Sequence, residues 1–220
     1  MKEKVKIPVV CPILEAHERM ARENREIFDS LGIYVVNLMS GPGAGKTTLL
    51  ERTIERLKGD LKIAVIEGDI QSQEDAERIA GKGIPVVQIN TGAACHLDGA
   101  MIRTALESLN LKGIDLLIIE NVGNLVCPAE FDLGEHEKVM ILSVAEGHDK
   151  PLKYPLMFQK SSVLIINKMD LLPYVECDVE KIRKFSLNLN PDQVVFPLSC
   201  KTGEGLDAWC DYLRSRVSSR

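Results

Sequence analysis

A glycine-rich loop between an apolar run and a helical pattern constrains this chain more than any other feature. Residues 40–48 read SGPGAGKTT, after the apolar run 33–39 and at the start of the helical pattern 47–57. The glycines permit a tight turn whose backbone N–H groups can face an anion, and the helix N-terminus adds a favourable dipole. This order of strand, loop and helix is typical of a P-loop that holds nucleotide phosphates. It predicts an α/β fold.

The alternation of strand and helix continues along the chain. Short apolar runs predict buried strands, and the amphipathic stretches between them predict helices. We expect strands at Ile33–Met39, Ile63–Ile66, Pro85–Ile89, Ile114–Ile119, Val139–Val144, Val163–Ile166 and Val194–Leu198. We expect helices at Ile13–Leu31, Thr47–Leu57, Gln71–Ile79, Asp98–Leu109, Asp178–Leu187 and Leu206–Val217. The pattern predicts a three-layer P-loop NTPase fold with a mainly parallel seven-stranded sheet, in which ligands bind at the carboxyl ends of the strands.

Length and charge narrow the class of protein further. At 220 residues the chain favours one compact domain, in which residues 1–32 supply an N-terminal helix and 33–220 the nucleotide-binding domain. The formal charge of -5 argues against a nucleic-acid partner. The N-terminus has no apolar signal core, and no segment has the roughly 20 consecutive apolar residues that span a membrane. We therefore expect a cytoplasmic protein, in which cysteines serve as metal ligands or core residues more often than in disulfides.

The P-loop supplies the first candidate site residues. Lys46 is expected to reach the β- and γ-phosphates, and the Thr47 hydroxyl to bind Mg²⁺. Ser40 stands where this pattern most often has glycine, and a small residue still fits there. The predicted nucleotide contacts in the loop are Gly41, Gly43, Ala44, Gly45, Lys46, Thr47 and Thr48.

A second motif specifies the base. Residues 167–170 read NKMD after a predicted strand, and 199–201 read SCK after the last strand. The Asp170 carboxylate can accept hydrogen bonds from guanine N1–H and from the exocyclic amine, whereas adenine presents an acceptor at N1 and lacks that amine. The Lys168 stem is expected to lie along the base. The predicted base contacts are Asn167, Lys168, Asp170, Ser199, Cys200 and Lys201, and the predicted nucleotide is GTP.

Two strand ends offer groups for the γ-phosphate and its metal ion. Glu120 follows a buried strand and is a candidate to hold Mg²⁺ directly or through water, and the Gly123 N–H is a candidate contact of the γ-phosphate. Asp69 is a second candidate for Mg²⁺ or for orienting the attacking water, with the alternative that it caps the next helix. Lys46, Asp69 and Glu120 are therefore the candidate catalytic groups. No arginine finger is evident in the sequence, so slow intrinsic GTP hydrolysis is expected.

Three soft ligands follow two other strands. Cys95 and His96 come after one strand and Cys127 after another, and thiolates and imidazole suit Zn²⁺ or Ni²⁺. Cys95 and His96 can bind one ion together only if the chain turns between them. Because one chain offers three ligands, a closed four-coordinate site predicts a symmetric dimer that pools its loops. The remaining histidines are expected to be solvated: His17, His136 and His148.

Four stretches together resemble the hydrogenase nickel-incorporation GTPase family. They are residues 40–48, 90–98 (NTGAACHLD), 120–128 (ENVGNLVCP) and 146–155 (EGHDKPLKYP). The resemblance implies GTP and metal binding linked to homodimerisation. It also implies that nickel passes, with a zinc-containing helper protein, to the large subunit of a [NiFe] hydrogenase. Carried over by residue, Cys95, His96 and Cys127 become metal ligands.

The resemblance leaves some points open. Lys153 is a candidate to reach the nucleotide of a neighbouring subunit, or else a solvated charge. Urease-maturation relatives share the nucleotide motifs, but their Cys-Pro-His metal motif is not found in this chain. The leading hypothesis is that γ-phosphate contacts pull Gly123 and shift Cys127. The alternative is a GTP-dependent regulatory module with a structural zinc ion.

Overall fold

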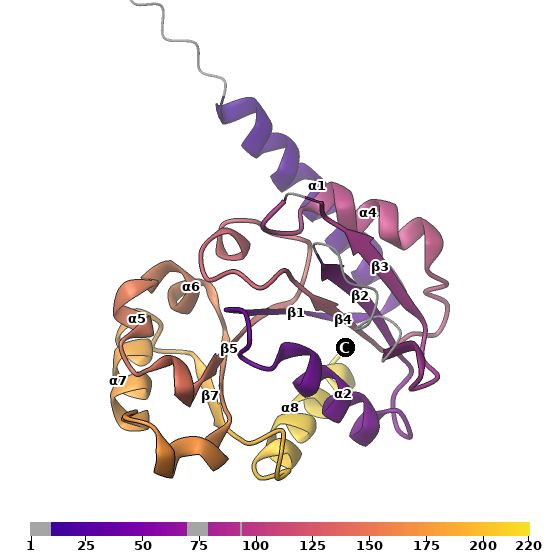
Figure 1. The fold of residues 1–220 in the computed structure, drawn as a ribbon. Helices are drawn as coiled ribbons and strands as arrows, with labels where there is room; N and C mark the ends of the chain where they lie inside the picture. The colour runs from indigo at the N-terminus through magenta and orange to yellow at the C-terminus, as the bar shows by residue number, and fades with distance from the viewer. Residues whose placement is uncertain (1–9, 70–78, 93) are drawn as a thin grey trace, which may run out of the picture.

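The computed structural model describes residues 10–69, 79–92 and 94–220, and Figure 1 shows the chain as a ribbon. The side chains of residues 10–14 and of Asp69 lie outside this description. The helix expected at Gln71–Ile79 falls almost entirely outside the described residues, so it stays a prediction.

A single seven-stranded sheet forms the centre of the molecule, in the order β3-β2-β4-β1-β5-β6-β7. Every strand pair is parallel, which confirms and sharpens the expectation of a mainly parallel sheet. The strands are β1 (Tyr34–Ser40), β2 (Ile63–Asp69), β3 (Val86–Asn90), β4 (Leu116–Glu120), β5 (Glu137–Ser143), β6 (Val163–Asn167) and β7 (Val194–Pro197).

Helices cover both faces of the sheet. They are α1 (Val10–Leu31), α2 (Lys46–Leu57), α4 (Gly99–Ser108), α5 (Lys150–Lys153), α6 (Pro155–Lys160), α7 (Val179–Leu189) and α8 (Leu206–Ser218). Figure 1 shows α1 beside α4 on one face and α2 with α8 on the other. The described helices predicted from the sequence differ from the observed ones only by a few residues at their ends.

Alternate residues of each strand enter different core clusters, which fixes the layers. In β1, Val36 and Leu38 pack with the apolar faces of α2 and α8, whereas Val35 packs with Phe28 of α1 and with α4. Met39 joins a third cluster with Phe158 of α6. Because both faces of the central strands are buried, their sequences are continuously apolar rather than alternating.

The segment after β5 departs from the prediction. We expected the strand to continue to Val144, but β5 ends at Ser143 and a 3-10 helix, η2 (Val144–Glu146), begins there. Ser143 and Glu146 form a capping box in which the backbone N–H of Ser143 donates to Glu146 Oε2 at 2.7 Å. The reciprocal bonds favour the turn over a further strand residue.

His136 is not solvated, contrary to the prediction. Its ring is 7% exposed, its Nδ1 accepts a hydrogen bond from the Val35 N–H at 2.9 Å, and its Nε2 lies 3.0 Å from Asp29. Burial of the ring lowers the pKa of His136 despite the nearby Asp29 carboxylate. The ring therefore joins α1 to the start of β1 as a structural group. Among the described residues no helix is long and apolar enough to cross a membrane.

Candidate nucleotide and metal sites

The P-loop lies between β1 and α2, with its glycines in the conformations that the motif requires. Gly43 and Gly45 have φ values of 76° and 99°, which other residues rarely adopt. A Cβ on Gly45 would lie 2.6 Å from the Asn167 amide nitrogen. That amide donates to the Ala44 carbonyl at 2.9 Å, so the base motif and the P-loop are directly joined.

A cavity of about 500 Å³ opens over the P-loop, and we call it the phosphate cavity. Its floor consists of P-loop backbone together with Lys46, whose Nζ donates to Ser40 Oγ at 3.2 Å. The predicted contacts that line it are Gly43, Gly45, Lys46, Thr47, Thr48, Glu120, Gly123 and Lys168. Polar and cationic groups that the sequence placed on separate segments therefore surround one space of the size that a triphosphate needs.

The acids around the phosphate cavity are only partly those expected. Thr47 Oγ1 donates to Glu120 Oε1 at 2.8 Å, which joins two of the three predicted Mg²⁺ ligands. Glu67, which the sequence analysis did not single out, also lines the cavity and is 2% exposed. Strand β2 extends past Ile66 to Asp69, and Glu67 pairs in register with Glu120 of β4. Glu67 was missed because its place beside Glu120 follows from the register of two strands. In the sequence, an acid after an apolar run indicates the end of the strand.

A second cavity of about 450 Å³, the base cavity, adjoins the first through Gly45, Thr48 and Lys168. Its lining includes Asn167, Asp170, Cys200 and Lys201 from the two predicted base motifs. Ser199 Oγ donates to Asp170 Oδ1 at 2.6 Å, which leaves Oδ2 of that carboxylate 3.8 Å from Lys201 Nζ. Burial raises the pKa of Cys200 to about 11, so its thiol stays protonated at neutral pH.

Lys168 is held across the P-loop. Its φ is 62°, and among the described residues other than glycine it is the one with a positive φ. Its Nζ donates to the Gly43 carbonyl at 2.7 Å. Its stem therefore passes between the two cavities, where the base of a bound nucleotide would meet it.

Some predicted residues line neither cavity. Gly41, Ala44 and Ser199 are absent from both linings, and a Cβ on Gly41 would lie 2.9 Å from Glu146 Oε1. Lys153 on α5 is exposed and pairs with Asp149 at 2.6 Å, so any nucleotide contact would be made in another subunit. The Asp69 side chain lies outside the described residues.

The cysteine and histidine ligands do come together. Among the described residues, Cys95, His96 and Cys127 form a group whose ligand atoms all lie within 4.8 Å of one another, and we call it the metal-ligand cluster. Cys95 Sγ lies 2.9 Å from Cys127 Sγ and 3.7 Å from His96 Nδ1. The chain turns before Cys95, where the Ala94 N–H donates to the Thr91 carbonyl at 3.0 Å. The predicted convergence of the two loops is therefore observed, although metal ligation stays a prediction.

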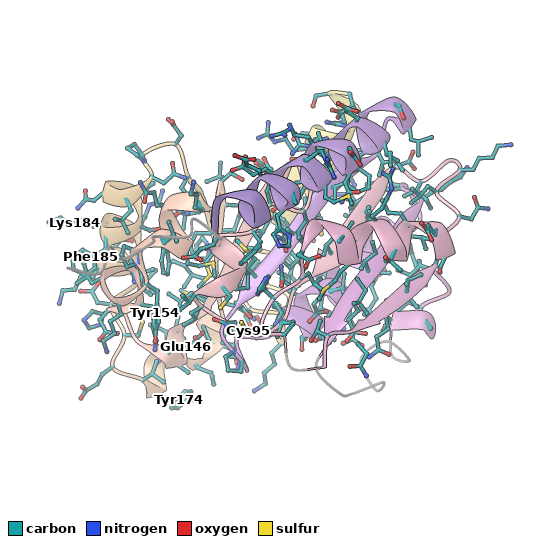
Figure 2. All side chains as sticks on the ribbon, turned by 90° about the horizontal axis from the view of Figure 1, so that it is seen from above. Cys95, Glu146, Tyr154, Tyr174, Lys184 and Phe185 are labelled. Atoms are coloured by element: carbon teal, nitrogen blue, oxygen red, sulfur yellow. The ribbon has the colours of Figure 1, made fainter. Side chains whose placement is uncertain are left out.

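The surroundings set the protonation of these ligands. The hydrogen bond with Cys95, and then burial, raise the pKa of Cys127, so its thiol stays protonated at neutral pH. Burial lowers the pKa of His96, which favours the neutral imidazole that metals bind. The His96 ring stacks on Phe131 with centroids 3.7 Å apart. Figure 2 labels Cys95, in the loop after β3, and Glu146, at the end of η2, which follows β5.

Known proteins share both the sequence and the fold. Residues 34–197 match the family described as CobW/HypB/UreG, nucleotide-binding domain. The hydrogenase maturation factor HypB of Escherichia coli K12 is 48% identical over 216 residues, which cover 98% of this chain and 74% of that protein. A probable HypB of Methanocaldococcus jannaschii is 43% identical and covers 96% of each chain.

Solved structures agree with these relatives. The crystal structure of HypB from Helicobacter pylori in complex with nickel has a TM-score of 0.89 at 39% identity and covers 93% of this chain and 96% of that one. HypB from Archaeoglobus fulgidus has a TM-score of 0.87 at 42% identity, with 92% and 99% covered. Matches of this identity and coverage place the chain in the CobW/HypB/UreG family, as a hydrogenase maturation factor of the HypB type.

Proposed function

We propose that this protein is a GTP-hydrolysing metallochaperone that binds Ni²⁺ or Zn²⁺ and assists nickel insertion into the large subunit of a [NiFe] hydrogenase. The observation that carries the proposal is the short path between the phosphate cavity and the metal-ligand cluster. Gly123 lines that cavity, and Cys127 follows four residues later in the same loop. The nickel complex of the Helicobacter pylori relative supports nickel as cargo.

Selection of GTP over ATP is proposed to depend on Asp170. The carboxylate lines the base cavity and is 14% exposed, so water competes little for its second oxygen. Guanine presents two hydrogen-bond donors to the Asp170 carboxylate, whereas the adenine of ATP would place an acceptor, N1, opposite the same carboxylate. Buried polar groups left without a partner give large discrimination, on the order of 10⁴ in favourable sites.

Hydrolysis is proposed to depend on charge neutralisation and positioning. Lys46 is available to the phosphates, and Thr47 and Glu120 form an oxygen-ligand pair of the kind that Mg²⁺ prefers. Glu67 is a further acid beside Glu120 in this cavity. When bound, Mg²⁺ would supply positive charge for the phosphates. Among the described residues lining the phosphate cavity there is no arginine, which supports slow intrinsic turnover.

The metal-ligand cluster suits Ni²⁺ or Zn²⁺ in its ligand types but must adjust when an ion binds. Two thiolates at about 2.3 Å from a tetrahedral ion lie on the order of 3.7 Å apart. The two sulfur atoms lie 2.9 Å apart in the structure. Binding therefore requires loss of the thiol protons and a small separation of the two loops. Because the two loops must separate, the affinity for the metal ion depends on the position of the loop that contains Cys127.

The Gly123–Cys127 loop touches the P-loop at two points. A Cβ on Gly123 would lie 3.3 Å from Pro42 Cα, and a Cβ on Gly41 would lie 3.4 Å from Leu125 Cγ. Asn124 Oδ1 accepts from the Val126 N–H at 2.8 Å, which shapes the turn before Cys127. We propose that the γ-phosphate draws on the Gly123 N–H and so shifts Cys127. Metal affinity and GTP affinity must then change by the same factor.

A homodimer is proposed to complete the metal site. Cys95 is exposed and Val126, beside Cys127, is 50% exposed, so the cluster lies at the surface where a second copy can reach it. A two-fold pairing of such clusters would provide the fourth ligand. The zinc-containing helper protein and the hydrogenase large subunit are the proposed partners in transfer.

The experiment measures Ni²⁺ and Zn²⁺ affinity by competition with a chromophoric chelator, with GDP and with a non-hydrolysable GTP analogue. We expect the native chain to differ between the two nucleotides by about 5- to 150-fold. Cys127→Ala should lose most of its affinity and the nucleotide effect, whereas Cys177→Ala, a half-buried cysteine outside the cluster, should behave as the native chain. Equal affinities in both nucleotide states would sink the proposal. Zinc that stays bound in every state, and whose removal unfolds the chain, would instead support a structural site.

A further inference from the structure

Asn121 occupies the point where the phosphate cavity meets both loops of the metal-ligand cluster. It directly follows β4, is 1% exposed and lines the phosphate cavity between Glu120 and Gly123. A buried amide needs partners for its carbonyl and for its NH₂ group. The identity of these partners shows what the side chain does.

The Asn121 carbonyl bridges the two loops. Oδ1 accepts from the Leu97 N–H at 3.1 Å and from the Val122 N–H at 3.0 Å. Leu97 directly follows Cys95 and His96, and Val122 begins the loop that leads to Cys127. One oxygen atom therefore ties the backbone of the first ligand loop to that of the second.

A buried network fixes the orientation of this amide. Asn121 Nδ2 donates to Asn37 Oδ1 at 3.2 Å, and Asn37 Nδ2 donates in turn to Glu135 Oε1 at 3.1 Å. The second oxygen of Glu135 accepts from the Leu133 N–H at 2.7 Å. Because the backbone N–H groups of Leu97 and Val122 can only donate, Asn121 must present its carbonyl to the loops and its NH₂ group to the Asn37 carbonyl.

Leu97 is also restrained from the opposite side. Its side chain is fully buried, and three of its carbon atoms lie 2.7, 2.8 and 2.8 Å from where a Cβ on Gly68 would stand. Gly68, like Asn121, lines the phosphate cavity. Leu97, which directly follows Cys95 and His96, is therefore held between Asn121 and Gly68, two residues that line the phosphate cavity.

We propose that Asn121 is a positioning residue that sets the distance between the Cys95–His96 loop and Cys127, and so couples the phosphate cavity to both sides of the metal-ligand cluster. The inference rests on the proposed function, because it concerns how that cluster is assembled. A shift in the strand end when nucleotide binds would move the loops together through one shared acceptor. Removal of the acceptor should leave the ligands present but poorly spaced.

The first test needs neither metal nor nucleotide. In glutathione buffers, the Cys95 and Cys127 thiols exchange with glutathione disulfide to give one protein disulfide and two reduced glutathione molecules. The equilibrium gives their effective molarity, with peptide mapping to exclude other pairs. We expect Asn121→Leu, which keeps volume but removes the acceptor, to lower this effective molarity on the order of tenfold. Asn121→Asp keeps an acceptor oxygen for both loops but loses the donor to the Asn37 carbonyl, so it should lose less effective molarity than Asn121→Leu.

The second test measures Ni²⁺ affinity of the same variants at saturating GDP and at a saturating GTP analogue. Asn121→Leu should bind Ni²⁺ on the order of 10- to 100-fold more weakly, with a smaller difference between nucleotide states. Gln193→Leu is the matched control, since Gln193 is another buried amide whose Nε2 donates to two backbone carbonyls, far from the cluster. It should lose stability without a change in Ni²⁺ affinity.

The outcomes separate the inference from the proposed function. Native effective molarity and native Ni²⁺ affinity in Asn121→Leu would overturn the positioning role, even if Cys127→Ala abolishes metal binding. If Cys127→Ala binds metal as the native chain does, the proposed function fails instead. Should the leucine variant not fold, hydrogen exchange of the native Leu97 N–H still decides the point. We expect slow exchange, and exchange as fast as that of an unbonded loop amide would overturn the bridge.

Discussion

Gly68→Ala should disturb the metal-ligand cluster through a single steric contact. The new Cβ would lie 2.7 to 2.8 Å from three carbon atoms of Leu97, whereas carbon atoms in van der Waals contact lie about 3.5–4.0 Å apart. Leu97 must therefore retreat by about 1 Å, and overpacking of this kind costs about 1–3 kcal/mol. Because Leu97 follows His96, the displacement should also weaken Ni²⁺ binding, on the order of tenfold.

A double-mutant cycle gives the contact its own signature. Leu97→Ala alone should cost about 2–5 kcal/mol, because Leu97 is fully buried. In the double variant the alanine at 68 has space, so the combined cost should be smaller than the sum by about 1–3 kcal/mol. Urea denaturation of the nucleotide-free protein measures each free energy of unfolding, and chelator competition measures Ni²⁺ affinity.

The matched cycle pairs Leu97→Ala with Gly59→Ala, where nothing lies within 4 Å of the added Cβ. That pair should be additive within about 0.5 kcal/mol. If Gly68→Ala and Leu97→Ala are also additive, the contact does not restrain Leu97 and the reasoning is refuted. If the double variant of Gly68→Ala and Leu97→Ala regains stability but not Ni²⁺ affinity, the packing around Leu97 and the position of the metal ligands are separate effects.

Three further predictions concern other parts of the molecule. Asp170→Asn should weaken GTP binding by at least on the order of 100-fold and shift preference toward xanthosine triphosphate, as measured by nucleotide titration, because an amide offers one acceptor and one donor where guanine needs two acceptors. Gly45→Ala, which adds a Cβ 2.6 Å from Asn167 Nδ2 at a φ of 99°, should weaken binding of a fluorescent GTP analogue on the order of tenfold or more, with Gly59→Ala unchanged. Burial raises the pKa of Glu135 from 4.5 to about 7, with Asp132 adding to the rise and Lys138 opposing it. The folded state therefore binds more protons than the unfolded state between these values, and stability should fall by about 2.5 kcal/mol as pH rises from 5 to 8. Glu135→Gln should lack this part of the slope in urea denaturation, and an unchanged slope would contradict it.

The sheet was predictable because its central strands are buried on both faces. Short, continuous apolar runs between turn residues, such as those of β4 and β6, are typical of strands in a parallel sheet that helices cover on both sides. The short helices α5 and α6 were not predicted, since Pro151 and Pro155 interrupt the segment and each helix spans about one turn or two. His136 was misjudged because its partners, Val35 and Asp29, are remote in sequence. Whether the chain is one compact domain with the proposed boundary at 32 and 33 stays a prediction.

The sites were predictable as far as motifs reach. Lys46, Asp170 and Cys127 lie where spacing placed them, because each follows a strand whose end the apolar pattern defines. Glu67 and Asn121 were missed, because their relevance comes from strand register and not from spacing along the chain. The role of a polar residue at a strand end can be recognised only when its neighbours in the sheet are known.

The order of the strands shows why a weak interaction would be enough for the proposed switch. Cys95 and His96 follow β3 and Cys127 follows β4, and β2, which ends near Gly68, lies between those two strands. The two loops of the metal-ligand cluster therefore lie on either side of the end of β2. The P-loop follows β1, which is the other neighbour of β4. A hydrogen bond to a charged phosphate contributes about 1.5–3 kcal/mol, which corresponds to roughly 10- to 150-fold in affinity. A single contact between the γ-phosphate and the Gly123 N–H can therefore supply the whole coupling that the proposed function requires, and loss of that contact on hydrolysis would suffice to change the affinity for the metal.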